Sequence, residues 1–403
     1  MPRGVSHLEP AVIPLDAATP RLSIVMPCLN EAETLATCIR KARNALSEMD
    51  FSCEIIIADN GSTDGSQAIA RAGGARVVEI SEKGYGCALR GGIAAALGEW
   101  IIMGDADDSY DFGSIAPFVE KLRDGFELVM GCRLPSGKGE IRSGAMPWKH
   151  RWIGNPVLTF LGQLFFKSAA RDFHCGLRAF RKDAIARMAL STTGMEFASE
   201  MVMKAALRKM RVTEVPIVLH KDGRSRPPHL RSWRDGWRHL RFMLLHCPLW
   251  LFFVPGVSLL LSGLALQLRV AAGPFKVGIF GFESNTLVVS SLGILLGIQL
   301  ICFGLFARIF ALNQGFLPPS RRLHFFESVF TLERGIWAGV LLGALGFSGL
   351  LHAVWIWRAA GFGQLPTAET LRLVIPATTG IASGAQLVFA SFLLGLLRLP
   401  VTR

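Results

Sequence analysis

The sequence lacks the residue patterns of disulfide-stabilised and zinc-binding proteins. Its eight cysteines are scattered, with no C-x-x-C pair and no metal-binding spacing between cysteine and histidine. A disulfide framework or a structural zinc site would need paired or clustered cysteines. We therefore interpret the cysteines as reduced packing residues in a cytosolic environment.

A long apolar run is also missing from the beginning of the chain. Met1–Pro20 contains four prolines and no continuous apolar segment. A secretory signal peptide requires such a segment, so the sequence predicts a disordered leader instead. We expect the part that follows to remain in the cytosol.

Four later segments lack acidic residues and are strongly apolar. They are Pro248–Val270, Leu287–Leu312, Gly335–Trp357 and Leu373–Leu397. Each reaches the length of about 20 residues that a membrane-spanning helix needs. A buried core helix can be equally apolar, but four such runs in succession favour a transmembrane domain. Their many small residues suit close helix packing within or between chains, which leaves room for a homo-oligomer.

Positive charge is concentrated beside the first of these runs. The net charge is +12, and Lys221–Leu245 alone holds seven Lys or Arg residues. Because cytoplasmic loops carry an excess of such residues, we expect both termini on the cytoplasmic side of a cytoplasmic (inner) membrane. A basic chain can also bind nucleic acid, but charge beside a membrane favours anionic lipid.

The first half of the chain alternates short apolar strands with helical segments. The expected strands are Leu22–Met26, Glu54–Ala58, Val77–Ile80, Trp100–Gly104 and Glu127–Gly131. Such alternation is typical of right-handed βαβ crossovers and a mostly parallel α/β sheet. We predict a leader at residues 1–20, an α/β domain at 21–220, and a transmembrane domain at 248–403.

Two segments have the composition of helices that lie in a membrane interface. Residues 221–247 form a basic amphipathic segment, in which Trp233 and Trp237 lie at helical spacing beside a stripe of arginines. Tryptophan and arginine together suit the headgroup layer. His150–Lys167 is rich in Trp, Leu and Phe, and is the second such segment.

Polar residues follow three of the expected strands directly. They form the stretches Pro27–Glu31, Asp59–Ser62 and Asp105–Asp108. A polar strand end is usually only a turn. In a parallel sheet, however, the carboxyl ends of the strands line one crevice, where ligands bind. Three such ends therefore predict a common site.

The strongest candidate within that site is the pair Asp105 and Asp107. Their spacing on an extended strand end lets both carboxylates reach the same side. Hard carboxylate oxygens suit Mg²⁺ or Mn²⁺, which also bind phosphate oxygens. A second candidate is Lys83–Gly86, a glycine-containing helix start that precedes Arg90 and could hold an anion.

Several motifs in fixed order carry a family resemblance. Between Leu22 and Arg241, the stretches MPCLNEAETL, IIIADNGSTDGS, KGYGCALRGGI, IIMGDADDSYDF, GCR, DFHCGLRAF and GMEFASE follow one another. This region resembles the family 2 glycosyltransferases, which have a Rossmann-like GT-A fold. Within that family it is similar to the polyprenyl-phosphate sugar synthases related to dolichol-phosphate mannose and glucose synthases. The resemblance implies metal-dependent, inverting transfer of a hexose from a UDP- or GDP-sugar to a polyprenyl phosphate.

The resemblance also implies roles for individual residues. The nucleotide sugar would be bound by Pro27, Leu29, Glu31, Asp59, Asn60, Lys83, Arg90, Asp105 and Ala106, with the metal on Asp105 and Asp107. The acceptor phosphate would be bound by Arg133, Arg151, His220, Lys221, Arg224 and Arg226. Asp172 would be a catalytic base or a carboxylate that orients the site.

Three positions depart from the family pattern. Asn60 replaces a second aspartate, Ser109 stands where relatives often have a metal-binding glutamine, and His220 replaces an arginine. A lipid phosphate monoester is largely a dianion at pH 7, so it needs no general base. What it needs is neutralisation and positioning, which guanidinium groups provide.

Two other functions remain open at this stage. A glycolipid synthase that uses a hydroxyl acceptor would need a base, for which Asp172 is the candidate. A lipid-translocating or scaffold membrane protein could use the first domain as a sugar-nucleotide sensor. A processive polysaccharide synthase is disfavoured, because Trp148–Trp152 has tryptophan where the Q-x-x-R-W motif requires glutamine.

Overall fold

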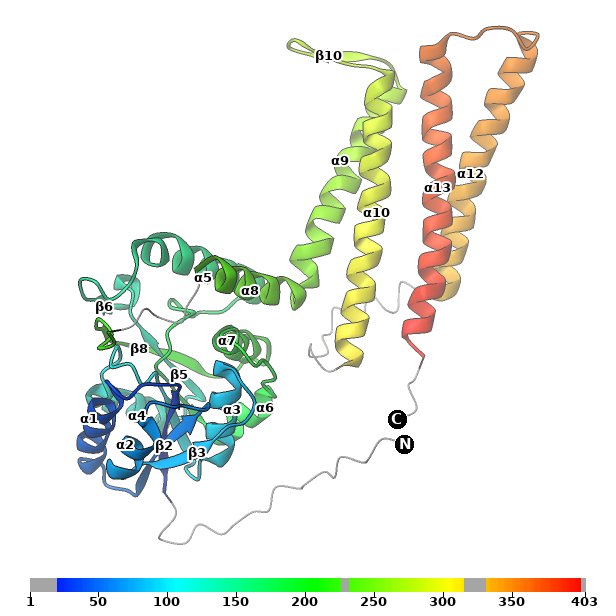
Figure 1. Ribbon diagram of the computed structural model, residues 1–403. Helices are drawn as coiled ribbons and strands as arrows, with labels where there is room; N and C mark the ends of the chain where they lie inside the picture. Colours follow the sequence, from blue (N-terminus) through cyan, green and yellow to red (C-terminus); the bar gives the residue numbers. More distant parts are fainter. Residues whose placement is uncertain (1–19, 226–231, 315–330, 400–403) are drawn as a thin grey trace. The chain divides into compact units, whose positions relative to one another are not determined.

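The computed structural model describes residues 20–225, 232–314 and 331–399 (Figure 1). The chain divides into two compact units, Met1–Met243 and Leu244–Arg403. We refer to them as the first and second unit and describe each separately. The leader expected at residues 1–20 falls almost entirely outside the described residues, as does Arg226.

The first unit is built on a seven-stranded sheet with the order β3-β2-β1-β4-β7-β5-β8. Its strands are β1 (Leu22–Cys28), β2 (Cys53–Asp59), β3 (Arg76–Glu79), β4 (Trp100–Met103), β5 (Leu128–Cys132), β7 (Arg178–Arg181) and β8 (Val212–Pro216). The neighbours β3, β2, β1 and β4 are all parallel, as are β5 and β8. The expectation of a mostly parallel α/β domain is therefore confirmed.

Helices cover both faces of this sheet. They are α1 (Leu35–Ser47), α2 (Ser66–Ala72), α3 (Tyr85–Ala95), α4 (Ala116–Arg123), α6 (Lys182–Met188) and α7 (Phe197–Leu207). On one face, Ile24 and Met26 of β1 belong to the same buried cluster as Leu35 of α1. On the other face, Gly92 of α3 approaches so closely that a Cβ there would lie 2.6 Å from Val25. Both faces of β1 are consequently buried, as expected for a central parallel strand.

Two strands of this sheet, β7 and β8, were not predicted from the sequence. β7 runs antiparallel to both β4 and β5, and so joins the two parallel parts of the sheet. Its sequence, RAFR, begins with the fully buried Arg178. The guanidinium of Arg178 donates to the carbonyl oxygens of Phe173, Cys175 and Ala198, at 3.1, 2.8 and 2.6 Å. These hydrogen bonds allow a charged residue to occupy the middle of the sheet.

Further elements of the first unit lie outside the large sheet. β6 (Glu140–Ile141) pairs with β9 (Val218–Leu219), while a π-helical turn at His150–Gly154 leads into α5 (Asn155–Phe166). α8 (Ser232–Leu245) follows residues 226–231, which the structure does not describe. Its last two residues belong to the second unit. Trp152 on the turn and Trp233 on α8 are 60% and 87% exposed. Large exposed tryptophans are what a helix in a membrane interface requires.

The second unit contains four helices that are long and apolar enough to cross a membrane, among the residues that can be described. They are Leu249–Ala271, which comprises a π-helical turn (Leu249–Phe253) and α9 (Val254–Ala271), then α10 (Ser284–Asn313), α12 (Leu332–Ala359) and α13 (Thr367–Leu397). Their mean hydropathies are 2.1, 2.2, 1.8 and 1.8. Each apolar run predicted from the sequence coincides largely with one of them. The chain is thus a multi-pass membrane protein.

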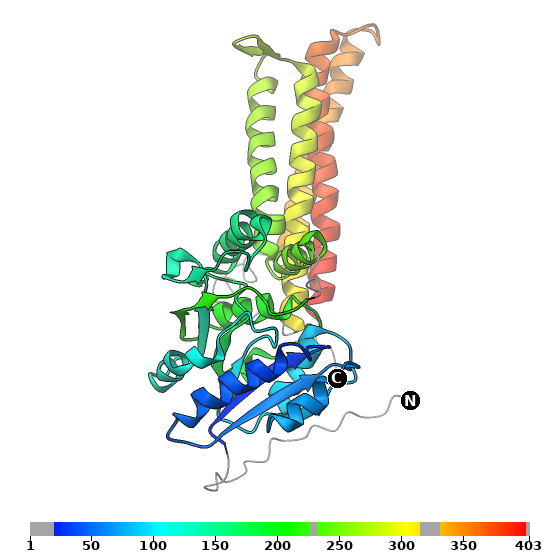
Figure 2. The same ribbon diagram turned by 60° about the vertical axis from the view of Figure 1, so that its left-hand side comes forward.

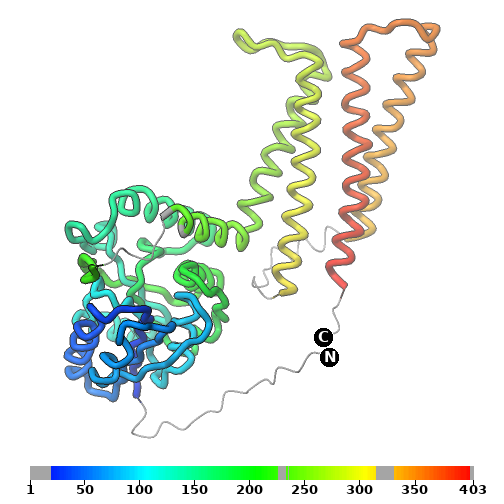
Figure 3. The backbone as a smooth tube through the Cα atoms, in the orientation of Figure 1, coloured from blue at the N-terminus to red at the C-terminus, as the bar shows by residue number. Residues whose placement is uncertain are grey.

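The four helices run side by side in Figures 1 and 2, as two hairpins that can be followed in Figure 3. Small residues bring the partners together. A Cβ on Gly297 of α10 would lie 2.6 Å from the backbone nitrogen of Leu260 in α9. A Cβ on Gly339 of α12 would lie 2.6 Å from the carbonyl oxygen of Gly384 in α13. Such close approach is the usual basis of helix packing in membranes.

We expect the buried arginine of β7 to be important for stability. Replacing Arg178 with alanine would leave three buried carbonyl oxygens without this donor, at a cost of about 3 kcal/mol or more. Arg181→Ala is the matched control, because its ion pairs with Glu99 and Asp183 are partly exposed and are worth at most about 1 kcal/mol. Thermal unfolding of the full-length protein should show a clearly lower Tm for Arg178→Ala alone. Equal Tm values would contradict this role.

Candidate functional site

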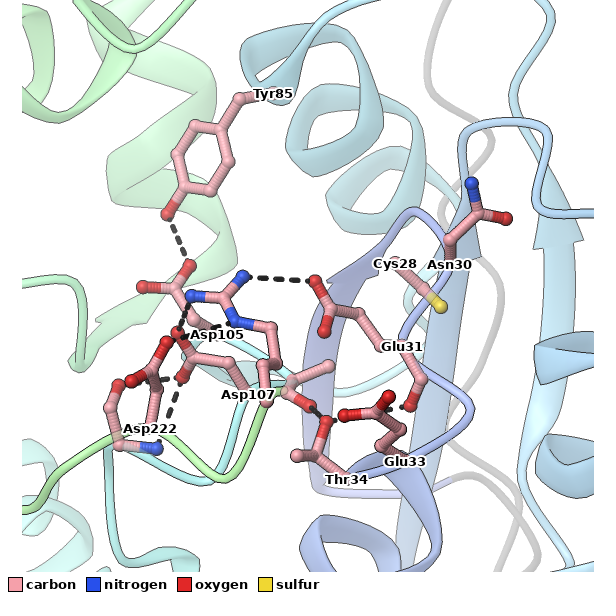
Figure 4. A network of polar contacts seen from close by, with 12 residues as sticks. Cys28, Asn30, Glu31, Glu33, Thr34, Tyr85, Asp105, Asp107 and Asp222 are labelled. Atoms are coloured by element: carbon pink, nitrogen blue, oxygen red, sulfur yellow. Dashed lines mark hydrogen bonds and ion pairs between the residues drawn. The ribbon is translucent and has the colours of Figure 1, made fainter. Parts of the chain in front are cut away.

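The loops that follow β1, β2 and β4 meet at one edge of the sheet. The Thr34 hydroxyl donates to the carbonyl oxygen of Ala106 at 2.7 Å, which joins the first loop to the third. Asn30 accepts from the backbone nitrogen of Thr63 at 2.7 Å, which joins the first loop to the second. All three polar strand ends singled out in the sequence are therefore neighbours. Figure 4 shows the first and the third of them.

Asp105 and Asp107 lie just beyond the end of β4, with different partners. The Tyr85 hydroxyl donates to one oxygen of Asp105 at 2.9 Å. The backbone nitrogen and hydroxyl of Ser109 donate to one oxygen of Asp107, at 3.0 and 2.6 Å. Burial and the nearby charge of Asp107 raise the pKa of Asp105 to about 7. Bringing these two carboxylates together is thus unfavourable, even with the Arg224 guanidinium nearby.

A single arginine supplies positive charge to this edge. Arg224 donates to Asp107 at 2.7 Å, to Glu31 at 3.2 Å and to Asp222 at 3.2 Å. Its side chain is only 12% exposed. The backbone nitrogen of Gly223 also donates to the carbonyl oxygen of Asp107 at 3.0 Å. We call Glu31, Asp105, Asp107 and Asp222 the acidic cluster; Arg224 is the cation that it holds.

The residues of the acidic cluster fit a divalent metal ion. Carboxylate oxygens are the ligands that Mg²⁺ and Mn²⁺ prefer. Across the described ranges, no three His, Cys, Asp or Glu residues form a complete metal-binding group. Mg²⁺ commonly uses only one or two carboxylates and completes its shell with water and phosphate oxygens. Asp105 and Asp107 therefore suit a metal that is bound together with a diphosphate.

Asp59 and Asn60, at the end of β2, hold loops in place through their side chains. Asp59 accepts from Gln67 at 2.6 Å and from the backbone nitrogen of Ser62. Burial opposes this charge, but the donors from Ser62 and Gln67 keep the pKa of Asp59 below its usual value. The Asn60 amide donates to the carbonyl oxygens of Ile80 and Glu82.

The departure at position 60 thus has a structural reason. The Asn60 side-chain oxygen accepts from the backbone nitrogen of Gly84 at 2.8 Å, so all parts of the amide are engaged with residues 80–84. An aspartate could not donate to the two carbonyl oxygens. The Lys83 ammonium group in turn donates to the Asn60 carbonyl oxygen at 2.7 Å. Asn60 therefore positions the loop that carries Lys83.

The other expected nucleotide residues lie in different surroundings. Pro27 and Glu31 are buried, whereas Leu29 is 37% exposed beside them in sequence. Arg90, on α3, donates to the carbonyl oxygen of Ser191 at 3.3 Å. It also lines a cavity of about 630 Å³ between α3 and α6.

Arg133 and Asp172 form a buried ion pair with each other. The Nε and Nη2 atoms of Arg133 donate to the two oxygens of Asp172, both at 2.7 Å, and the Arg133 backbone nitrogen donates at 2.9 Å. Burial opposes ionisation, but the guanidinium keeps the pKa of Asp172 below its usual value. The ion pair and the lowered pKa of Asp172 favour the role of an orienting carboxylate over that of a base, while the acceptor role of Arg133 stays a prediction.

The remaining acceptor-side residues are spread over two loops. Arg151 lies 5.4 Å from the ring centroid of Trp152 and, with Arg171, lines a mostly apolar cavity of about 330 Å³. The His220 backbone nitrogen donates to the carbonyl oxygen of Ser109 at 2.9 Å, which attaches the loop of residues 220–225 to the acidic cluster. Lys221 on that loop is exposed.

Sequence reasoning missed the two tyrosines of the chain. Tyr85 donates to Asp105, and the Tyr110 hydroxyl accepts from the backbone nitrogen of Gly176 at 2.8 Å. A Cβ on Gly176 would lie 2.8 Å from Asp105 and 3.0 Å from Tyr110, so both rings are close to this carboxylate. Their rarity, two in 403 residues, was the one available signal.

Two family models match the chain. The model for glycosyl transferase family 2 matches residues 23–188. The model for the glycosyltransferase family 2 C-terminal transmembrane region matches residues 305–398. Together they cover most of the sheet in the first unit and the last two spans of the second.

Two relatives and one solved structure are similar to this chain. A low-salt glycan biosynthesis hexosyltransferase of Haloferax volcanii is 40% identical over 381 residues, which are 93% of this chain and 89% of that protein. A dolichyl-phosphate hexose transferase of the same organism is 28% identical over 49% of this chain and 81% of its own length. Glucosyl-3-phosphoglycerate synthase of Mycobacterium tuberculosis, crystallised with Mn²⁺ and UDP, is 21% identical, with a TM-score of 0.45 over 57% of this chain and 80% of that one.

We expect the Arg133–Asp172 pair to stabilise the fold. Asp172→Asn leaves a buried guanidinium without its counter-charge and should cost about 3–5 kcal/mol. Replacing both residues together, Arg133→Met with Asp172→Leu, should recover much of that loss, because no unpaired charge remains. The measurement is the Tm of the full-length protein, with the exposed Asp183→Asn as control. An Asp172→Asn variant that is inactive but as stable as the parent would instead support a catalytic base.

A further prediction concerns the competition between Arg224 and a metal ion. Its guanidinium holds Asp107 and Glu31, so it competes with any metal ion for the same oxygens. A unit charge about 4 Å away is worth roughly 4 kcal/mol near a protein surface. Arg224→Gln should therefore bind Mn²⁺ at least about tenfold more tightly when no nucleotide is present, as measured by electron paramagnetic resonance. Arg171→Gln is the matched control and should leave this affinity unchanged; an unchanged affinity in Arg224→Gln would show that the arginine does not compete.

Proposed function

Because the chain belongs to glycosyltransferase family 2, we propose that it transfers a hexose from a nucleoside diphosphate sugar to a polyprenyl phosphate. The product is a lipid-linked sugar, and the configuration at the anomeric carbon is inverted. The observation that carries this proposal is the acidic cluster at the carboxyl edge of the sheet, next to loops that follow β1 and β2. Ligands of α/β proteins bind at such an edge.

Asp105 and Asp107 would hold the metal ion. The ion, when bound, neutralises negative charge on the nucleoside diphosphate that leaves. Arg224 lies 2.7 Å from Asp107 and is therefore within reach of the same phosphates. Lys83 is positioned through Asn60, at the loop that begins α3. These groups provide the positive charge that a departing diphosphate requires.

The engagement of Asp172 favours a phosphate acceptor over a hydroxyl acceptor. A hydroxyl group must lose a proton as it attacks, so it needs a general base. Asp172 is paired with Arg133 and has a lowered pKa, which makes it a poor base. A lipid phosphate is already largely a dianion at pH 7 and attacks without losing a proton. The name of the dolichyl-phosphate hexose transferase relative is in keeping with such an acceptor.

Basic residues of two loops would bind the acceptor phosphate. They are Arg151 on the turn before α5, and His220, Lys221 and Arg224 on the loop after β9, together with Arg226, which lies outside the described residues. Guanidinium groups suit phosphate because they donate two parallel hydrogen bonds. Arg133 is left out of this set, since two of its donors are already engaged by Asp172.

The acceptor lipid would be located in the membrane. The four apolar helices make the chain a multi-pass membrane protein. The excess of Lys and Arg in Lys221–Leu245 favours the cytoplasmic side for the first unit and for both termini. Nucleotide sugars would then reach the acidic cluster from the cytosol, and the lipid phosphate would come from the adjoining leaflet.

The direct test is a transfer assay with purified full-length protein, Mn²⁺, undecaprenyl phosphate and labelled UDP- or GDP-hexoses. We expect chloroform-extractable label with at least one donor. Asp107→Ala should lower kcat by about a hundredfold or more, as the loss of a charge-stabilising group does in other enzymes. Asp108→Ala is the matched control; this residue pairs with Lys41, so its loss should change kcat only a few-fold. The proposal fails if no donor yields a lipid-linked product.

A further inference from the structure

The second unit contains a cavity that the proposed chemistry does not use. It has a volume of about 480 Å³ and lies among α9, α10, α12 and α13. Ligand pockets commonly measure about 300–1,000 Å³, so this one is large enough for a single ligand. Its walls come from both helix hairpins, which are otherwise packed through small residues.

The cavity has an apolar body. Ile298, Cys302 and Phe306 line it from one face of α10, while Ala338 and Ala390 line it from α12 and α13. The lining residues of α10 extend from Ile298 to Phe306. These eight steps along the helix, at 1.5 Å each, correspond to about 12 Å. The body is therefore a slot that runs parallel to the membrane-spanning helices. A hydrocarbon chain is the ligand that suits such a slot.

Polar residues lie at one end of the slot. Thr331, Arg334 and Ser391 are the hydroxyl-bearing and charged residues among those that line it, and no acidic residue does so in the part of the chain that the structure describes. They come from the first turn of α12 and the last part of α13. Gly335 permits their approach, since a Cβ there would overlap the Ser391 side chain. A cation at the end of an apolar slot favours an anionic headgroup.

We propose that this cavity is a holding site for the polyprenyl phosphate before transfer, with the first isoprene units in the slot and the phosphate at Arg334; it is separate from the basic loops of the first unit proposed to bind the phosphate during transfer. This inference rests on the proposed function for the identity of the lipid. The single apolar slot suits a lipid with one hydrocarbon chain. The single cation at its end suits a phosphate monoester. A phospholipid with two chains would leave its second chain outside. The second unit would then be a binding site for the acceptor as well as an anchor.

The test is native mass spectrometry of the full-length protein in detergent, with undecaprenyl phosphate and phosphatidylglycerol as probes. Arg334→Gln should weaken retention of undecaprenyl phosphate by roughly fivefold, the effect of about 1 kcal/mol for one basic residue near the membrane surface. Ala338→Trp and Ala390→Trp should abolish it by filling the slot from two different helices. Phosphatidylglycerol should not be retained.

Two matched controls lie on α12. Ala344→Trp adds the same side chain at an exposed position outside the cavity, and Arg358→Gln removes a charge at the opposite end of the helix. Both should retain undecaprenyl phosphate as the parent does. Each variant is also checked for an unchanged Tm. Because Arg334 is exposed, its replacement should fold even if a tryptophan variant does not.

The outcomes separate this inference from the proposed function. If folded Ala338→Trp, Ala390→Trp and Arg334→Gln all retain the lipid phosphate, the cavity is not its site, even when the parent protein transfers hexose. Equal retention of phosphatidylglycerol also overturns the assignment. If the variants lose the lipid but the parent makes no lipid-linked sugar with any donor, the cavity assignment stands and the proposed function fails.

Discussion

The first unit depends on keeping several carboxylates close together at one edge of its sheet. Glu31, Asp105, Asp107 and Asp222 come from three loops, and like charges at such distances repel one another by several kcal/mol. Arg224 offsets this repulsion by binding three of them, and the hydroxyl groups of Tyr85 and Ser109 donate to Asp105 and Asp107. We propose that an edge built in this way attracts a metal ion, and that it binds a phosphate together with that ion.

The pair Arg133 and Asp172, unlike the acidic cluster, contains one charge of each sign. Arg133 and Asp172 are buried and hydrogen-bond to each other. We therefore expect the pair to stabilise the fold. Their pairing makes Asp172 a poor candidate for a base. It therefore supports the proposal that the acceptor is already an anion.

Much of the fold could be predicted because it depends on local patterns. The alternation of apolar strands and helices, the polar strand ends and the four apolar runs are each contained within short windows. β7 could not be predicted, because it begins with a charged residue, Arg178, and one of the three carbonyl oxygens that bind this residue belongs to Ala198, 20 positions away. The partners of Arg224 were equally hidden, since Asp107 and Glu31 lie 117 and 193 positions away. Long-range ion pairs leave no periodicity in a sequence.

The central claim is that the acidic cluster holds a metal ion together with a nucleoside diphosphate. Isothermal titration of the full-length protein with UDP and with GDP, in the presence and absence of Mn²⁺, tests it most directly. The account predicts that at least one of the two nucleotides binds tenfold or more tightly with Mn²⁺, because metal and phosphate share the oxygens of Asp105 and Asp107. Affinities for both nucleotides that do not change with Mn²⁺ would contradict it.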